Sequence, residues 1–332
     1  MIDAHIHYSR SVGPQRLKKV IEEMNLEGIA LLCIPKGGTI PVEEDAFAFR
    51  DSCSIPVYVF GGLDRSIYSP GLTPSAFAKR ADRELSRLLA LGCTGIKMLE
   101  GKPDVRKAFP VPDFDSEAFA PFFRRLEQEQ IPVILHVNDP EEFWDGEHVA
   151  DYVKKAGWFY DDTFINNEEQ YTQILNVLER HPRLRILFPH FFFLSCQLKR
   201  LAKILDSYPN VWIDLTPGIE LYYNLSAQGD TARQFIDRYQ NRIIYGTDMG
   251  ARVLIRKEDV PLSIEECRSR VKLIRDFLET KGDYLLTEDG YYVVERDPVI
   301  MHGLGLSEEV LNKIYQQNFL DFINRNKADG CR

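Results

Sequence analysis

Four histidines, one lysine and one aspartate lie in or directly after short apolar segments, where polar side chains are uncommon. His5 and His7 are separated by a single residue in IDAHIHY. The others are far apart along the chain, and they are Lys97, His136, His190 and Asp248. Imidazole and carboxylate groups are ligands of zinc and other divalent transition metals. Burying this many titratable groups without an ion would be costly, so together they predict a metal site.

Eight strand-like segments contain these residues, and segments of helical character separate most of them. The strand-like segments are near-continuous apolar runs, which is typical of parallel strands buried on both faces. They span residues 2–8, 28–35, 56–64, 93–99, 132–138, 184–192, 210–216 and 242–249. Helices are predicted at residues 43–51, 74–91, 115–129, 168–180, 195–207 and 307–325, the last closing the barrel from outside. This alternation predicts an α/β fold, a (β/α)8 TIM barrel with loop insertions, as one domain over residues 1–332.

The predicted barrel places the polar residues at one mouth, because strand carboxyl ends form the active-site face of this fold. His5 and His7, two residues apart, share one face of the first strand. His136, His190 and Asp248 end the fifth, sixth and eighth strands. Each alone has an alternative interpretation: the HxH pair can be accidental, the later histidines can pack in the core, and the aspartate can cap the next segment.

Two segments are predicted to be insertions. Residues 138–167, after the fifth strand, are rich in aromatic and acidic side chains. Residues 283–297 are predicted to form a hairpin with its turn at Asp289 and Gly290.

Composition restricts the classes of function. The chain has 332 residues, 44% hydrophobic and 27% charged, with a net charge of −9 and no basic stripe of the kind that binds nucleic acid. Its apolar runs are too short to cross a bilayer, its first residues lack the design of a secretory signal, and its six scattered cysteines fit a reducing compartment. We therefore expect a cytoplasmic protein that acts on a small molecule, not on nucleic acid or a membrane.

The motifs together resemble the amidohydrolase superfamily, and most closely its amidohydrolase-related branch, which includes aminocarboxymuconate-semialdehyde decarboxylase. The stretches that carry the resemblance run from end to end of the chain, and they are IDAHIH, TGIKM, PVILHV, ERHPRLRILFPHF, YPNVWIDLTPG, RIIYGTDMG and KIYQQNFLDF. The resemblance implies a metal-dependent hydrolase or decarboxylase, and it is compatible with a homodimer.

Carried over by position, the resemblance implies that one metal ion is bound by His5, His7, His136 and Asp248. Zn²⁺ is the favoured ion, with Mn²⁺, Fe²⁺ and Co²⁺ as alternatives. Asp248 would also accept a proton from the metal-activated water, and His190 would be an acid–base or electrophilic group. The phenylalanines after His190 and the long segment after His136 are unusual for the branch, so the substrate stays open.

Further candidates for substrate contact follow the strands. Lys97 is at the position where other superfamily members carry a carboxylated lysine that bridges two metals; we favour an unmodified ammonium that binds a substrate anion or pairs with an acid. Arg65 and Arg252 can clamp a carboxylate, and Tyr222 can line the pocket. Surface or packing roles are the alternatives for these three residues.

The leading hypothesis is hydrolysis of an amide, lactone or similar bond in a small organic molecule. The alternative is non-oxidative decarboxylation of an unsaturated or aromatic acid. A third interpretation is a metal-binding barrel without catalytic activity, against which the intact ligand set argues.

Overall fold

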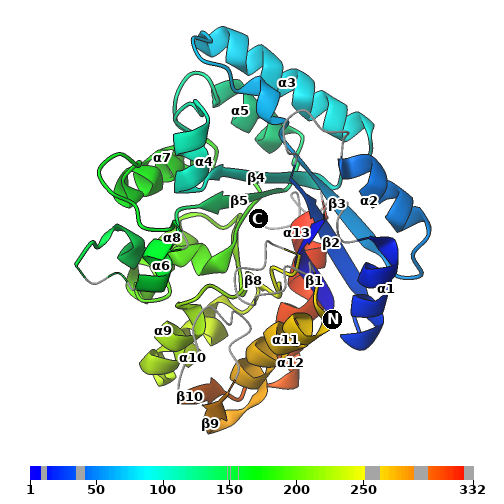
Figure 1. Ribbon diagram of the computed structural model, residues 1–332, viewed down its shortest axis with the longest axis vertical. Helices are drawn as coiled ribbons and strands as arrows, with labels where there is room; N and C mark the ends of the chain where they lie inside the picture. The colour runs from blue at the N-terminus through cyan, green and yellow to red at the C-terminus, as the bar shows by residue number, and fades with distance from the viewer. Residues whose placement is uncertain are drawn as a thin grey trace.

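Eight parallel strands form one sheet in which each strand pairs with the next along the chain (Figure 1). The computed structural model describes residues 1–8, 13–34, 42–147, 149, 151–155, 157–250, 262–287 and 298–324. The strands are β1 (Ile2–Tyr8), β2 (Gly28–Cys33), β3 (Val57–Gly62), β4 (Gly95–Gly101), β5 (Val133–Val137), β6 (Ile186–Phe188), β7 (Val211–Asp214) and β8 (Ile243–Ile244). All eight predicted strands are confirmed, although β6 and β8 are much shorter than their apolar runs.

The sheet closes into a barrel because the segment after β8 runs beside β1. The His7 N–H donates to the Met249 carbonyl (2.7 Å), and the Asp248 N–H donates to the His5 carbonyl (2.9 Å). The TIM barrel is therefore confirmed, and its closure brings the two ends of the predicted ligand set side by side.

Helices cover the outside of the barrel between successive strands (Figure 1). They are α1 (Pro14–Glu23), α2 (Val42–Asp51), α3 (Pro74–Ala90), α4 (Pro103–Ala108), α5 (Ala120–Gln128), α7 (Asn167–Arg180), α8 (Leu198–Ser207), α9 (Leu221–Gln228), α10 (Asp230–Tyr239) and α11 (Ile264–Glu279). The predicted helix at 115–129 begins only at Ala120. Asp115 lies before the helix, and its carboxylate accepts a hydrogen bond from Asn176 of α7 (2.8 Å).

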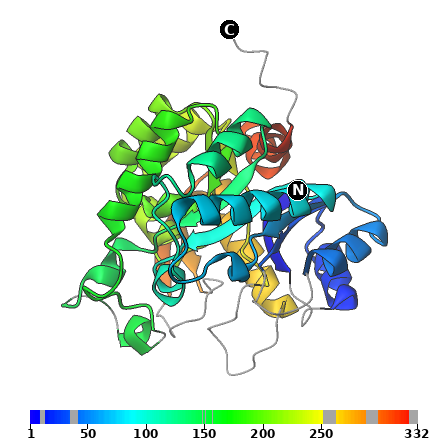
Figure 2. The ribbon, with the colours of Figure 1, turned by 90° about the horizontal axis from the view of Figure 1, so that it is seen from above.

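The C-terminal helical segment closes one end of the barrel. It comprises α12 (Glu308–Asn312), a π-helical turn (Lys313–Gln317) and α13 (Asn318–Ile323). Phe319 and Phe322 pack against inward-facing strand residues that include Ile2, Ala4, Ala30, Leu32, Phe60, Ile134, Leu187, Trp212 and Ile244. The prediction that this segment closes the barrel from outside holds for Val310 and Ile314, which pack in the outer core, whereas Phe319 and Phe322, three residues apart on one face, close the end of the barrel. In Figure 2 α13 (red) lies at the end of the barrel away from the insertion after β5 (green).

The first predicted insertion forms structure of its own, and the second is described only in part. Residues 138–167 contain a 3₁₀ turn, η2 (Glu141–Trp144), and α6 (Asp151–Lys155), and they have a small apolar core of their own. The hairpin consists of antiparallel strands β9 (Lys281–Leu286) and β10 (Val299–Leu304), so that β9 begins before the predicted range 283–297 and β10 follows it. The predicted turn at Asp289 and Gly290 lies outside the described residues. Among the described helices, none is long and apolar enough to cross a membrane.

Candidate metal centre

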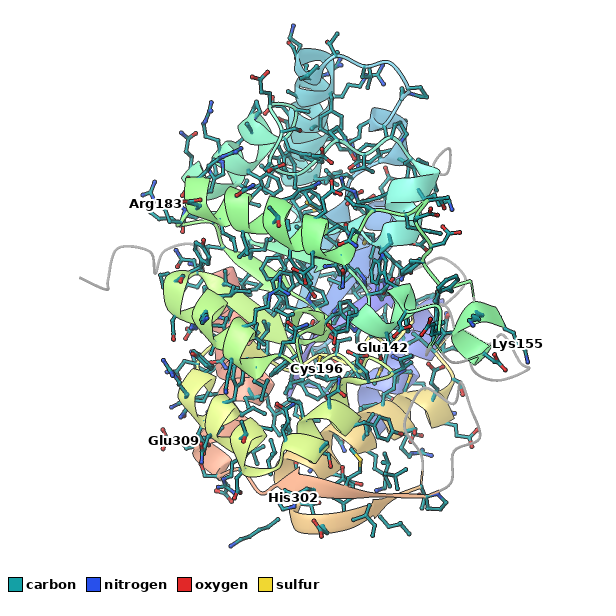
Figure 3. All side chains as sticks on the ribbon, turned by 90° about the vertical axis from the view of Figure 1, so that its left-hand side faces the viewer. Glu142, Lys155, Arg183, Cys196, His302 and Glu309 are labelled. Carbon is teal, nitrogen blue, oxygen red and sulfur yellow. The ribbon has the colours of Figure 1, made fainter. Side chains whose placement is uncertain are left out.

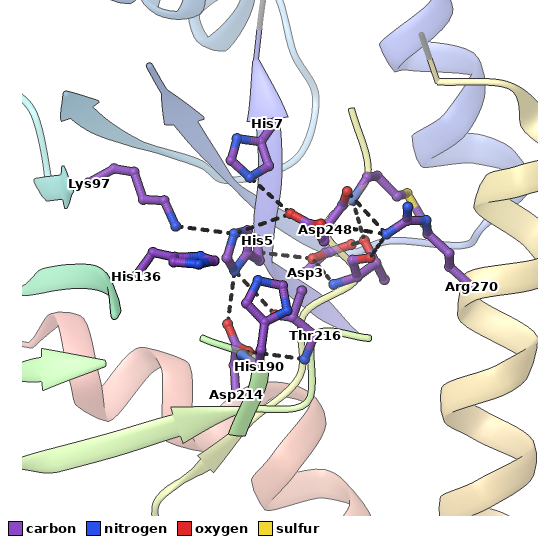
Figure 4. A network of polar contacts seen from close by, with 12 residues as sticks. Asp3, His5, His7, Lys97, His136, His190, Asp214, Thr216, Asp248 and Arg270 are labelled. Carbon is purple, nitrogen blue, oxygen red and sulfur yellow. Dashed lines mark hydrogen bonds and ion pairs between the residues drawn. The ribbon is translucent and has the colours of Figure 1, made fainter. Parts of the chain in front are cut away.

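Three of the predicted ligands lie together at the mouth of the barrel. Ligand atoms of His5, His7 and Asp248 are all within 4.8 Å of one another (Figure 4). Asp248 Oδ1 lies 2.9 Å from His7 Nε2 and 3.6 Å from His5 Nε2. Two imidazoles from β1 and one carboxylate from the segment after β8 thus converge on a volume that could hold an ion.

Asp214, the last residue of β7, sets the orientation of His5. The Nδ1–H of His5 donates to Asp214 Oδ2 (2.9 Å), which leaves the lone pair of Nε2 directed at the cluster. The other oxygen of Asp214 accepts the backbone N–H groups of His190 (2.8 Å) and Thr216 (3.0 Å). A carboxylate behind a metal-binding histidine fixes its tautomer and raises its basicity.

A second buried carboxyl, Asp3, joins β1 to the segment after β8. It accepts the Thr247 hydroxyl (2.5 Å) and the backbone N–H groups of His5 (3.0 Å) and Thr247 (3.2 Å). Burial raises the pKa of Asp3 to about 7 despite these hydrogen bonds. Asp3 therefore holds together the two backbone segments that present the three candidate ligands.

Asp248 is ionised in this environment. Burial alone would raise its pKa, but the hydrogen bond from His7 and the nearby histidines outweigh that effect and hold the pKa well below its ordinary value. Asp248 has a left-handed backbone conformation (φ 59°). Arg270 of α11 contacts both the side chain and the backbone of this segment. One guanidinium nitrogen lies 3.7 Å from Asp248 Oδ2 and donates to the Thr247 carbonyl (3.0 Å).

Lys97 reaches the same cluster from β4. Its Nζ lies 3.3 Å from His5 Nε2, and only 2% of the residue is exposed. Burial lowers the pKa of Lys97 to about 8. Lys97 and Arg65 both line a cavity of about 10 Å³, and the Arg65 guanidinium also stacks 4.7 Å above the Phe109 ring. Of the predicted substrate residues, Lys97 is placed at the cluster, and Arg65 shares the small cavity beside Lys97.

His136 and His190 lie beside the three-residue cluster. Their ring centroids are 5.2 Å apart, and that of His190 is 5.9 Å from the His5 ring. Burial lowers the pKa of both, for His190 to about 4, so both imidazoles are neutral at neutral pH. His136 Nε2 lies 3.4 Å from Asp139 Oδ1, and His190 Nδ1 has no hydrogen-bond partner among the described residues.

The chain after β6 forms a left-handed turn that carries His190. Residues 190–193 all have positive φ angles, between 52° and 58°. Left-handed geometry costs a non-glycine residue roughly 1–2 kcal/mol, so tertiary contacts must hold this turn. The Tyr171 hydroxyl donates to the Phe192 carbonyl (2.9 Å), Phe192 stacks on Phe188 (3.9 Å), and Phe193 stacks on His190 (5.0 Å). The phenylalanine run after His190 therefore positions the imidazole.

Asp139 ties the insertion after β5 to the mouth. Its Oδ2 accepts hydrogen bonds from Lys102, after β4 (2.6 Å), and from the hydroxyl of Tyr160 (2.5 Å). Tyr160 belongs to the apolar core of the insertion. The aromatic insertion is thus anchored next to His136.

Two predicted substrate residues are not placed at the cluster. Tyr222 is buried in the core: its hydroxyl donates to the Leu215 carbonyl (2.5 Å) and its ring packs on Phe277. Those contacts assign it a packing role. Arg252 lies outside the described residues.

The sequence analysis missed the charged residues that hold the candidate ligands and their backbone in place, among them Asp3, Asp139, Asp214, Lys102 and Arg270. Asp214 could have been found, because it ends an apolar strand just as His136 does. Asp3 stands in the same IDAHIHY segment as the histidines. The contacts of Lys102 and Arg270 depend on three-dimensional packing and have no comparable signal.

Comparison with known proteins agrees with this geometry. A family model described as amidohydrolase matches residues 60–318, well over half of the chain. An uncharacterized TIM-barrel protein from Bordetella bronchiseptica is similar, with 12% identity, 98% of each chain covered and a TM-score of 0.61. No curated protein matches the chain significantly.

Two further solved structures are similar in fold. One is a dihydroxybenzoic acid decarboxylase from Polaromonas sp. JS666 with bound manganese and 2-nitroresorcinol, at 16% identity, with 98% of this chain and 97% of that one covered and a TM-score of 0.56. The other is a probable 2-pyrone-4,6-dicarboxylic acid hydrolase from Acinetobacter baumannii, at 13% identity, with 97% and 98% covered and a TM-score of 0.50.

Proposed function

The chain belongs to the amidohydrolase family, and on that premise we propose that it is a metal-dependent hydrolase of small organic molecules with an amide, lactone or related bond. The observation that carries the proposal is the convergence of His5, His7 and Asp248 within 4.8 Å. A binding protein without chemistry would not need a buried ionised carboxylate and two imidazoles within 4.8 Å of one another.

The donor set fits a divalent transition metal. Nε2 of His5, Nε2 of His7 and Asp248 Oδ1 would hold the ion, with His136 as a further ligand from β5. Nitrogen and oxygen donors of this kind favour Zn²⁺, and the manganese in the Polaromonas decarboxylase supports Mn²⁺ as the alternative. A divalent ion supplies electrophilic polarisation and lowers the pKa of water to roughly 7.

Protein groups around the ion would carry the proton and orient the substrate. Asp248 is an ionised carboxylate, and its Oδ2 is available to accept a proton from a nucleophilic water and return it to the leaving group. His190 is neutral, with Nδ1 unpartnered among the described residues, and it would hydrogen-bond to the substrate oxygen on which charge develops. Asp214 keeps His5 and the turn of His190 in register during these steps.

Decarboxylation of an unsaturated or aromatic acid is a second candidate. The observation that favours it is the buried Lys97 ammonium, 3.3 Å from His5 Nε2, which could hold a substrate carboxylate beside the ion. We retain the proposal that Lys97 is an unmodified ammonium, because its pKa, lowered by burial to about 8 against the opposing charges of Asp248, Asp214 and Glu100, keeps it protonated at neutral pH.

Metal analysis tests the proposal directly. Protein stripped with a chelator and reloaded with Zn²⁺ should retain about one equivalent per chain, as expected for a single closed set of ligands. The double variant His5→Ala, His7→Ala should lose nearly all of it, whereas His302→Ala, at an exposed histidine on β10, should retain it. Full occupancy in the double variant would exclude this site.

Product analysis separates the two reactions. Reloaded protein is incubated with a panel of lactones and amides and with a panel of aromatic and unsaturated carboxylic acids. The hydrolase proposal expects ring-opened or cleaved products without gas release. Release of carbon dioxide from the acid panel alone would replace hydrolysis by decarboxylation, and no turnover of either panel by metal-loaded protein would count against both.

A further inference from the structure

Glu220, at the end of the loop after β7, is a buried carboxyl for which the structure supplies no partner. It is 8% exposed, and neither of its carboxyl oxygens has a hydrogen-bond partner among the described residues. Gly218 makes room for it, because a Cβ on Gly218 would come within 2.5 Å of Glu220 Oε2. The buried acids Asp3, Asp139 and Asp214 differ, since each accepts two or more hydrogen bonds.

The surroundings of Glu220 are acidic. The charge of Glu142, in η2 of the insertion, acts on Glu220 most strongly, followed by that of Asp139. Glu142 makes no ion pair or side-chain hydrogen bond with a described residue, whereas its neighbour Glu141 accepts a hydrogen bond from Gln197 (2.6 Å) and contacts Cys196 (3.4 Å). Figure 3 labels Glu142 and Cys196, with Lys155 at the outer edge of the insertion.

Among the residues that the structure describes, no cation is paired with Glu142 or Glu220, and the ammonium of Lys102 is already bound to Asp139. Burial and the charge of Glu142 raise the pKa of Glu220 to about 8, so its carboxyl is largely protonated at neutral pH. Buried carboxylates are ordinarily paired with cations, and a bound cation would remove the cost of leaving this pair unpaired.

Asp139 links the surroundings of Glu220 to the candidate metal centre. Asp139, which acts on Glu220 electrostatically, is 3.4 Å from His136. Ile219, next to Glu220, packs against the apolar core of the insertion that contains Phe143 and Tyr160. A substrate whose reacting bond reaches the ion would extend its other end towards these acids.

We propose that Glu142 and Glu220 form a subsite for a positively charged group of the substrate, a primary ammonium or a guanidinium. The inference deepens the proposed function, because it rests on substrate binding at this mouth. It restricts the substrate class to molecules that carry a cationic group on the side away from the bond that reacts.

Calorimetric titration with benzylammonium chloride, and with benzyl alcohol as a neutral probe of similar size, tests the subsite without turnover. Zinc-loaded protein should bind benzylammonium at least tenfold more tightly than benzyl alcohol. Glu220→Gln and Glu142→Gln should each abolish that preference, and Glu141→Gln, the matched control on the same turn, should keep it. Because Glu142 is only partly buried, its variant serves even if Glu220→Gln fails to fold.

Equal binding of the two probes, binding of neither, or a preference that survives Glu142→Gln would overturn the subsite. The same titration on chelator-treated protein distinguishes the two proposals. If the chelator-treated protein prefers benzylammonium but takes up no zinc on reloading, the subsite stands and the proposed function falls. Metal binding and hydrolysis without the preference would do the reverse.

Discussion

The two ends of the barrel are built from the same strands and have opposite chemistry. β1 contributes Ile2 and Ala4 to the closed end, and His5 and His7 to the mouth. At the closed end, aliphatic and aromatic side chains fill the interior beneath Phe319 and Phe322. At the mouth, buried titratable groups are concentrated, and they include His5, Lys97, His136, His190 and Asp248.

The difference shows how this fold separates stability from chemistry. Uncompensated polar atoms are costly, and a barrel can carry them at one end only if the other end supplies apolar burial. His136, His190 and Glu220 at the mouth each have a buried atom without a partner among the described residues, and at the closed end Trp212 Nε1 is in the same state. Damage to the closed end should therefore affect folding, and damage to the mouth should affect binding.

The largest expected effect is at the closed end. Phe322→Ala removes a ring that stacks on Phe60 and leaves a cavity beneath the barrel, which should lower the free energy of unfolding by about 3–5 kcal/mol. Denaturant titration measures the loss, and zinc affinity of the folded fraction should stay within twofold of the parent. A zinc affinity that falls together with the free energy of unfolding would contradict the claim that the closed end determines stability and the mouth determines binding.

At the mouth, Asp214→Asn should act on metal binding. The amide cannot accept the His5 Nδ1–H as the carboxylate does, so zinc affinity should fall by about 10–100-fold. Competition with a chromophoric chelator measures it. Asp237→Asn, at a surface aspartate paired with Arg233 on α10, is the control and should bind zinc as the parent does. An unchanged affinity in Asp214→Asn would mean that His5 is oriented by other contacts.

The smallest expected effect is a pH dependence of the free energy of unfolding, which arises from Asp3 at the mouth. The pKa of Asp3 is about 7 in the folded protein and 3.8 ordinarily. Between these two pH values the folded state therefore holds a proton that the unfolded state has lost. Metal-free protein should thus lose stability as pH rises from 5 to 7, by at most about 1.4 kcal/mol per pH unit for this proton.

Asp3→Asn should reduce that slope by the share of this one proton, because the amide mimics the neutral acid, whereas the share of Glu220, whose pKa is also raised, should remain. Denaturant titrations at pH 5, 6 and 7 compare it with Phe322→Ala, in which the slope should persist at lower overall stability. A slope that is the same in Asp3→Asn and in the parent would show that Asp3 is ionised throughout.

Much of the fold was predictable because it depends on local pattern. Continuous apolar runs separated by amphipathic segments specify parallel strands and outer helices, and the strand-end rule located His136, His190 and Asp248. The π-helical turn and the inward face of the C-terminal segment were not predictable in this way. The three-residue spacing of Phe319 and Phe322 is the same whether their helix packs against the outside of the barrel or closes its end.

The supporting half of the site depends on contacts between distant segments. Tyr222 follows a strand, as Arg65 does, yet Tyr222 turns into the core because Leu215 offers a carbonyl for its hydroxyl. Sequence position places a residue at the mouth but does not specify the direction of its side chain. The roles of Lys102 and Arg270 could not be predicted for the same reason, because they depend on where the side chains point.

The left-handed turn at residues 190–193 has a consequence for the order of folding. Its four residues oppose their intrinsic backbone preference, so the turn cannot persist in a chain that is only locally structured. It becomes favourable once Asp214 of β7 and Tyr171 of α7 are in place to accept and donate its hydrogen bonds. His190 therefore reaches its position late, and a partly folded chain cannot display a complete site.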